Sequence, residues 1–309
     1  MKAATVLTVL VSGSLVVVLL TFRTAPLPEG APFIGDLPVA SPPAGLAAFR
    51  LPTGVLPRSA GFAYRGGSFA DKRAFAVTSV LVKHPRGDLL IDTGFGRSIA
   101  AQFANMPALF RALTRYEFSA SAADLLERAH YDRAKLRGII LTHAHWDHAS
   151  GLTDFPGTPV LVTGAERAFV KTGGASTELA RSIPNVRYEE YRFESGSYLG
   201  FARSHDVYGD GSIVIVPTPG HTPGSVIVFL TLPGDLRFAF VGDLVWQLEG
   251  LRLREERPWL MRLMVDLDAD GVRTNLQHMA RVAARFPELV IVPAHDQRGF
   301  ARLPLLSPR

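Results

Sequence analysis

The sequence of 309 residues contains no cysteine. This excludes disulfide bonds, a cysteine nucleophile and thiolate metal ligands, so any metal ion would have to be bound by His, Asp or Glu. A Gly-x-Ser-x-Gly motif, which marks many serine hydrolases, is also missing. There is no long block of Lys or Arg, although 33 basic residues exceed 28 acidic ones. A dispersed basic surface does not indicate nucleic-acid binding, and we expect no nucleic acid among the partners.

Charged residues are missing from residues 3–22, which are rich in Val and Leu and lie between Lys2 and Arg23. About 20 apolar residues can span a bilayer, whereas a cleavable signal peptide usually has an apolar region of about 7–15 residues. We therefore predict an N-terminal hydrophobic helix within residues 1–24 that acts as a signal anchor, with a cleaved signal peptide as the alternative. Both interpretations predict membrane attachment or export, with the folded body outside the cytoplasm.

The rest of the chain divides into two parts. Residues 25–69 are rich in Pro and Gly and predict a linker and lead-in, and residues 70–309 predict a folded domain in which order begins near residue 70. We expect strands at 75–82, 88–92, 138–141, 159–162, 186–193, 212–217, 225–231, 237–242 and 289–292, and helices at 97–115, 121–130, 166–170 and 270–285. Strands interspersed with helices predict an α/β fold of packed layers.

The densest group of metal-ligand residue types follows the apolar run 138–141. It consists of His143, His145, Asp147 and His148. In an extended segment His143 and His145 share a face, and the turn that follows can aim Asp147 and His148 at a neighbouring point. This spacing predicts two adjacent metal ions, and the alternative is a polar surface loop that happens to be rich in histidine.

Three later residues of ligand type each follow the end of an apolar run. His221 follows 212–217, Asp243 follows 238–241 and His295 follows 290–292. Ligands at the ends of separate strands can converge on one edge of a sheet. Each residue alone would be interpreted as a cap or a turn residue.

In this order the seven residues resemble the pattern of the metallo-β-lactamase superfamily, and the resemblance covers roughly residues 70–300. It implies an αββα four-layer sandwich with a two-metal site along one edge. The residues that would bind one metal are His143, His145 and His221, those that would bind the other are Asp147, His148 and His295, and Asp243 would bridge both. Asp92 matches an early strand-end Asp of the family that is usually structural.

Five further residues receive no ligand role, and they are His84, His130, His205, His278 and Asp296. We expect them at the surface or behind the ligands. Asp296 could orient the imidazole of His295.

The resemblance implies a hydrolase that uses two divalent ions, with Zn²⁺ expected and Fe²⁺ or Mn²⁺ as alternatives. We predict that it opens a lactone, ester or thioester bond in a small molecule, and that Asp147 or Asp243 also takes a proton. A β-lactamase or a phosphodiesterase of the same fold is the alternative. Asp243 stands where two-zinc β-lactamases commonly have Cys, which makes a β-lactamase the weaker alternative. A non-catalytic binding module would have lost ligands, whereas all seven are present.

Tryptophan replaces tyrosine at one position of the resemblance. Acyl-homoserine lactonases have a Tyr three residues after the bridging Asp, and this chain has Trp246. The apolar segment from Trp246 to Met264 predicts a wall of the substrate pocket that includes Trp246 and Trp259. The alternatives are ordinary core or a membrane-facing patch beside the anchor.

Overall fold

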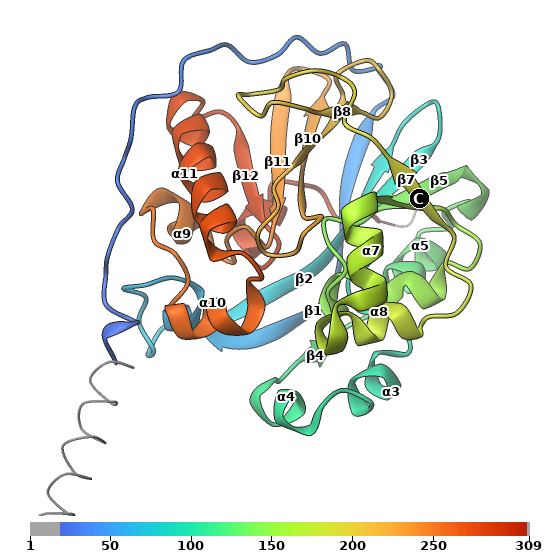
Figure 1. The fold of residues 1–309 in the computed structure, drawn as a ribbon. Coiled ribbons are helices and arrows are strands. Elements are labelled where there is room, and N and C mark those ends of the chain that lie inside the picture. Colours follow the sequence, from blue (N-terminus) through green and yellow to red (C-terminus); the bar gives the residue numbers. More distant parts are fainter. Residues whose placement is uncertain (1–18, 308–309) are drawn as a thin grey trace, which may run out of the picture.

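Two β-sheets pack face to face in the computed structural model, which describes residues 19–307 (Figure 1). The first sheet has the strand order β4 (Glu117–Phe118), β1 (Ala47–Ser59), β2 (Lys72–Lys83), β3 (Asp88–Ile91), β5 (Leu136–Ile140), β6 (Val160–Thr163) and β7 (Tyr188–Tyr191). The second has the order β12 (Val290–Pro293), β11 (Leu236–Gly242), β10 (Val226–Leu232), β9 (Ile213–Pro217) and β8 (His205–Asp206).

Helices surround the two sheets (Figure 1). They are α2 (Ala60–Ala63), α3 (Ile99–Ala104), α4 (Ala108–Leu113), α5 (Ala122–Arg128), α6 (Trp146–Ala149), α7 (Gly164–Thr172), α8 (Glu178–Ser182), α9 (Leu248–Arg252), α10 (Trp259–Val265), α11 (Ala269–Arg285) and α12 (Gln297–Phe300). Short 3₁₀ turns lie at Arg133–Lys135, Ser150–Asp154 and Gly174–Thr177.

Three apolar clusters hold these layers together. One lies between the sheets and joins residues such as Ile91 and Ile140 of the first sheet to Phe240 of the second. The other two lie on the outer faces of the sheets, where α5 covers the first sheet and α11 covers the second through Leu276 and its neighbours. This order of clusters confirms the prediction of two packed sheets with helices outside.

The prediction of a linker over 25–69 missed the longest strand, β1, which pairs with β2 along its whole length. Pro52, Gly54 and Pro57 gave this segment the composition of a loop. Proline is tolerated because the opposite edge of β1 pairs with β4 over only two residues, so few amide donors are required there. Order therefore begins well before residue 70.

The prediction of one of the helices was also wrong, because a proline interrupts it. The single helix expected over 97–115 is divided into α3 and α4, and Pro107 is the N-cap of the second.

The predicted N-terminal helix lies almost entirely outside the described residues. Within residues 19–307, no helix is long and apolar enough to cross a membrane.

Replacement of Gly54 by Ala should destabilise the fold. A Cβ atom at Gly54 would lie 2.3 Å from the backbone oxygen of Glu117 and 2.7 Å from the Phe95 ring, so backbone must move. We expect a loss of about 1–3 kcal/mol, visible as a lower melting temperature. Gly45→Ala is the matched control, because its Cβ would meet only a Pro85 carbon at 3.8 Å. Equal melting temperatures for both variants would contradict the packing described for β1.

Candidate metal centre

The seven predicted ligand residues meet at one edge of the two sheets. The segment after β5 carries His143 and His145 and continues into α6, which contains Asp147 and His148. The remaining three residues follow the ends of strands of the second sheet: His221 follows β9, Asp243 follows β11 and His295 follows β12. The prediction that separate strand ends converge is confirmed by this arrangement.

The carboxylate of Asp243 lies between two groups of histidines. Its Oδ2 is 3.3 Å from Nε2 of His221 and 4.0 Å from Nε2 of His143. Its Oδ1 is 3.2 Å from Nε2 of His295 and 3.4 Å from Nε2 of His148. One oxygen thus faces each group, which is the arrangement expected of a carboxylate that bridges two ions.

Three sets of potential ligand atoms lie within 4.8 Å of one another. They are His143 with His145 and His221, His143 with His148 and Asp243, and Asp147 with His148 and His295. The first and third sets are the two triads that the sequence predicts.

Several of these ligand atoms are buried without a partner. In the described part of the chain, Nε2 of His143, His148 and His221 and Oδ1 of Asp243 make no hydrogen bond. An unsatisfied buried polar group costs about 1–3 kcal/mol, so four of them at one point need an explanation. Divalent cations coordinated by imidazole and carboxylate would satisfy all four, and this donor set suits Zn²⁺, Fe²⁺ or Mn²⁺. The residues therefore fit a metal centre.

The protonation states are compatible with metal binding. Burial, together with neighbouring imidazoles, lowers the pKa of His143 and His145 well below the usual histidine value, so both rings are neutral. Burial opposes ionisation of Asp243, but the surrounding histidines hold its pKa well below the usual range. Burial also opposes the charge of His148, yet Asp92 and Asp243 raise its pKa well above the usual value. Metal binding at His148 would therefore release a proton.

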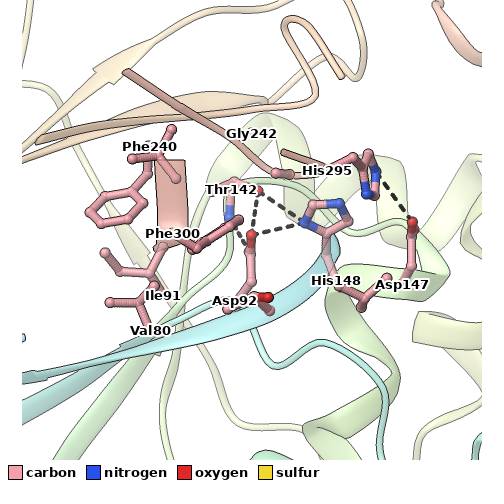
Figure 2. Close-up of a pocket in the computed structure, with 14 residues that line it drawn as sticks. Val80, Ile91, Asp92, Thr142, Asp147, His148, Phe240, Gly242, His295 and Phe300 are labelled. Carbon is pink, nitrogen blue, oxygen red and sulfur yellow. Dashed lines mark hydrogen bonds and ion pairs between the residues drawn. The ribbon is translucent and has the colours of Figure 1, made fainter. Parts of the chain in front are cut away.

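Residues behind the ligands hold the outward-facing ring nitrogens (Figure 2). Nδ1 of His148 lies 2.8 Å from Oδ2 of Asp92, and Nδ1 of His295 lies 2.8 Å from the backbone oxygen of Ala76. Asp92 also accepts the backbone N–H and the hydroxyl of Thr142, at 2.7 and 2.8 Å. These contacts direct Nε2 of both rings to the centre.

Asp266, which we did not predict, holds the third imidazole. Its Oδ1 lies 2.9 Å from Nδ1 of His221, and its side chain is fully buried. Arg257 donates hydrogen bonds to the same carboxylate and to the backbone oxygen of Asp243, the latter at 2.7 Å. Burial favours the protonated acid, but Arg257 and His221 hold the pKa of Asp266 below its usual value. An aspartate 45 residues after its histidine leaves no local signal in the sequence.

Glu166, which the sequence analysis also did not predict, connects the segment that carries His143 and His145 to the segment that carries His221. Its carboxylate accepts the backbone N–H of Ala144 at 2.6 Å, the hydroxyl of Thr222 at 2.7 Å and the backbone N–H of Gly224 at 3.0 Å. Burial raises the pKa of this carboxyl, against the effect of the three donors. The sequence signal that could have indicated Glu166 is Thr163, the N-cap of α7. The Thr163 hydroxyl accepts the backbone N–H of Glu166, which places this glutamate in the first turn of the helix.

Asp296 does not orient the imidazole of His295, whose Nδ1 lies against the backbone oxygen of Ala76. Asp296 is the N-cap of α12 and accepts hydrogen bonds from Arg298 and from the backbone of Leu248. The other non-ligand histidines, His84, His130, His205 and His278, lie outside the three ligand sets. His84 is buried against Tyr208 and paired with Asp210, so it is a core residue.

The centre opens into a cleft of about 270 Å³. Its apolar lining includes Leu56, Phe75, Met106, Phe110, Trp146, Trp246, Met264 and Val265. Trp246 therefore lies where we predicted, whereas Trp259 is not among the residues that line the cleft. The wall from α10 is formed instead by Met264 and Val265, because they lie at the other end of this short helix.

A second, internal cavity of about 20 Å³ lies behind the centre, between the sheets (Figure 2). Phe240 and Phe300 line it on one side and Asp147, His148 and His295 on the other. The centre is therefore backed by the apolar core that joins the sheets.

The model of the Metallo-beta-lactamase superfamily matches residues 73–295. The chain belongs to this superfamily. As a metallo-beta-lactamase superfamily member it is a hydrolase, as the sequence predicted.

Relatives and solved structures agree with this assignment. The chain is 30% identical over 236 residues to a probable metallo-hydrolase of Mycobacterium tuberculosis, covering 70% of this chain and 73% of that protein. It is 22% identical over 232 residues to an N-acyl homoserine lactonase of Rhizobium radiobacter, covering 72% and 82%. A structure of an N-acyl homoserine lactone hydrolase with N-hexanoyl-L-homoserine at its metal centre has a TM-score of 0.67 at 17% identity, covering 84% and 96%. The last comparison shows the shared fold.

Asp266→Asn should weaken metal binding. The variant removes the charge that holds Nδ1 of His221, and loss of such a partner typically lowers metal affinity about 10- to 100-fold. Competition with a chromophoric zinc chelator measures the affinity, with circular dichroism as the check on folding. Asp270→Asn is the matched control, because its side chain is 86% exposed on the nearby helix α11. If both variants bind zinc as the wild type does, Asp266 has no role in the centre.

Proposed function

We propose that this chain uses two divalent metal ions to hydrolyse a lactone, ester or thioester of moderate apolar character. The observation that carries the proposal is the division of the Asp243 carboxylate, with one oxygen toward each histidine group. His143, His145 and His221 would hold one ion, and Asp147, His148 and His295 would hold the other. Zn²⁺ is the expected metal, with Fe²⁺ or Mn²⁺ as alternatives.

Bound divalent ions would polarise a carbonyl oxygen and lower the pKa of a water from about 15.7 toward 7. The side chains of the protein would position the reacting groups and transfer the proton. Asp147 and Asp243 both line the cleft, and Oδ2 of Asp147 lies 3.5 Å from Nε2 of His295. Asp147 is therefore the carboxylate placed to accept a proton from the attacking water and return it to the leaving oxygen or sulfur, because both oxygens of Asp243 face the histidine groups.

The lining of the cleft supports an apolar acyl substrate. Its walls are mostly aromatic and aliphatic, and Arg58 carries the only permanent positive charge among the described residues that line it. The Arg58 guanidinium already donates to the backbone oxygen of Leu113 and to the hydroxyl of Thr114. Apart from the metal ions, the described lining of the cleft therefore offers no free cationic side chain to a phosphate diester. The lactonase among the relatives supports the same bond class.

A panel of substrates tests the proposal. It contains acyl-homoserine lactones, aryl esters, a glutathione thioester, a cephalosporin and a bis-aryl phosphate. We expect metal-dependent turnover within the first three, and a loss of kcat/KM of at least about 100-fold in Asp243→Ala. Asp235→Ala is the control, because this aspartate is exposed beyond the other end of β11. Turnover confined to the phosphate diester or to the cephalosporin would replace the proposal with a phosphodiesterase or a β-lactamase.

Trp246→Phe tests the position where lactonases have tyrosine. The indole Nε1–H donates to Oδ2 of Asp243 at 2.8 Å, so this donor orients the central carboxylate. A hydrogen bond to a charged group contributes about 1.5–3 kcal/mol, and we expect kcat/KM to fall about 10- to 100-fold. Trp259→Phe makes the same chemical change outside the cleft and should leave kcat/KM unchanged. Equal kcat/KM values for the two variants would show that the Trp246 indole does not contribute to catalysis.

A further inference from the structure

Two short helices at the cleft expose large apolar side chains. Neither α4 nor α10 has a buried residue. Leu109 of α4 is 72% exposed and Leu263 of α10 is 73% exposed. Together with the exposed side chains of Leu113, Met264 and Leu267, they form what we call the apolar rim. Scattered exposed leucines are ordinary, but a group around one opening indicates an interaction surface.

The same helices line the entrance to the metal centre. Phe110 of α4 and Met264 and Val265 of α10 line the cleft together with His145 and Asp147. Both helices lie in the lower half of the molecule as drawn in Figure 1, α4 at the bottom and α10 above it to the left. A partner on the apolar rim would therefore also lie at the mouth of the cleft.

On the α4 side, the charged side chains near the apolar rim are positive. Residues 98–116 contain Arg111 and Arg115 and no Asp or Glu, whereas Arg97 before them is paired with Asp124 and Glu127. Arg111 and Arg115 are exposed next to Leu109 and Leu113. Exposed leucines beside arginines are typical of helices that lie in the interface of an anionic bilayer.

The N-terminal apolar run enters the body beside α10. Phe22 closes the uncharged run 3–22, and its ring packs on Phe62 and Phe69 with centroids 6.2 and 4.9 Å away. Three residues later the backbone N–H of Ala25 donates to Glu255 at 2.9 Å. The next residue in sequence, Glu256, accepts from Arg262 of α10 at 2.6 Å. A run long enough to enter a bilayer thus joins the body next to one side of the rim.

We propose that the apolar rim docks on an anionic lipid bilayer, with the mouth of the cleft facing the lipid. A bilayer fits better than a second copy of the chain, because the uncharged run ends beside α10 and the α4 segment carries only positive charge. An apolar substrate dissolved in the bilayer could then enter the cleft without crossing water. This last consequence rests on the proposed function, whereas the docking does not.

The absence of cysteine allows a direct test on the full chain. Leu109→Cys and Leu263→Cys each provide a single site for an environment-sensitive fluorophore such as NBD. Leu236→Cys is the matched control, because Leu236 is an exposed leucine at the end of β11 opposite Gly242 and the metal centre. Each labelled protein is mixed with vesicles of phosphatidylcholine and phosphatidylglycerol, with and without nitroxide-labelled lipid.

On vesicles we expect the labels at positions 109 and 263 to shift to shorter wavelength and to be quenched by the nitroxide lipid, and the label at position 236 to remain in water. Vesicle-bound protein with all three labels in water would overturn the proposal, because the N-terminal run alone would then hold it. Failure to bind vesicles would overturn it as well. The same blue shift at positions 109 and 263 before vesicles are added would identify a second copy of the chain as the occupant instead. Turnover of the substrate panel in detergent reports separately on the proposed function.

Discussion

The structure of the site depends on one buried carboxylate. Asp243 is only 6% exposed, and both of its oxygens face histidine nitrogens, three of which make no hydrogen bond in the described part of the chain. A charge in such a position is stabilised only by partners on all sides. The two ligand triads, the indole of Trp246 and the buried pair of Arg257 and Asp266 therefore form one arrangement around this group.

The fold supplies these partners through the ends of its strands. β9, β11 and β12 belong to one sheet and deliver one residue each, while the segment after β5 brings the other four from the opposite sheet. The carboxylates of Glu166 and Asp92 then fix the segment after β5 by accepting the backbone N–H groups of Ala144 and Thr142. Each ligand set takes residues from both sheets, so the apolar core between the sheets determines the distances within each set, and packing and chemistry are coupled there.

A group of histidines with an aspartate directly after an apolar run is a dense local signal, and the seven residues predicted as ligands lie together at one edge of the sheets. The sequence also located most strands from their apolar runs. It missed β1, whose prolines imitate a linker, and it missed Asp266 and Glu166, whose partners are distant in the chain. It included Trp259 in the pocket because apolar composition does not reveal which end of a short helix lies at the cleft. Tertiary contacts of this kind leave no periodic pattern.

Anomalous diffraction from crystals of the zinc-loaded protein tests the two-metal arrangement most directly. The account predicts two anomalous peaks, one among His143, His145 and His221 and the other among Asp147, His148 and His295, with the Asp243 carboxylate between them. Asp243→Ala crystals should lose at least one peak under the same loading conditions. A single fully occupied peak in the wild type, or peaks away from these residues, would contradict the account.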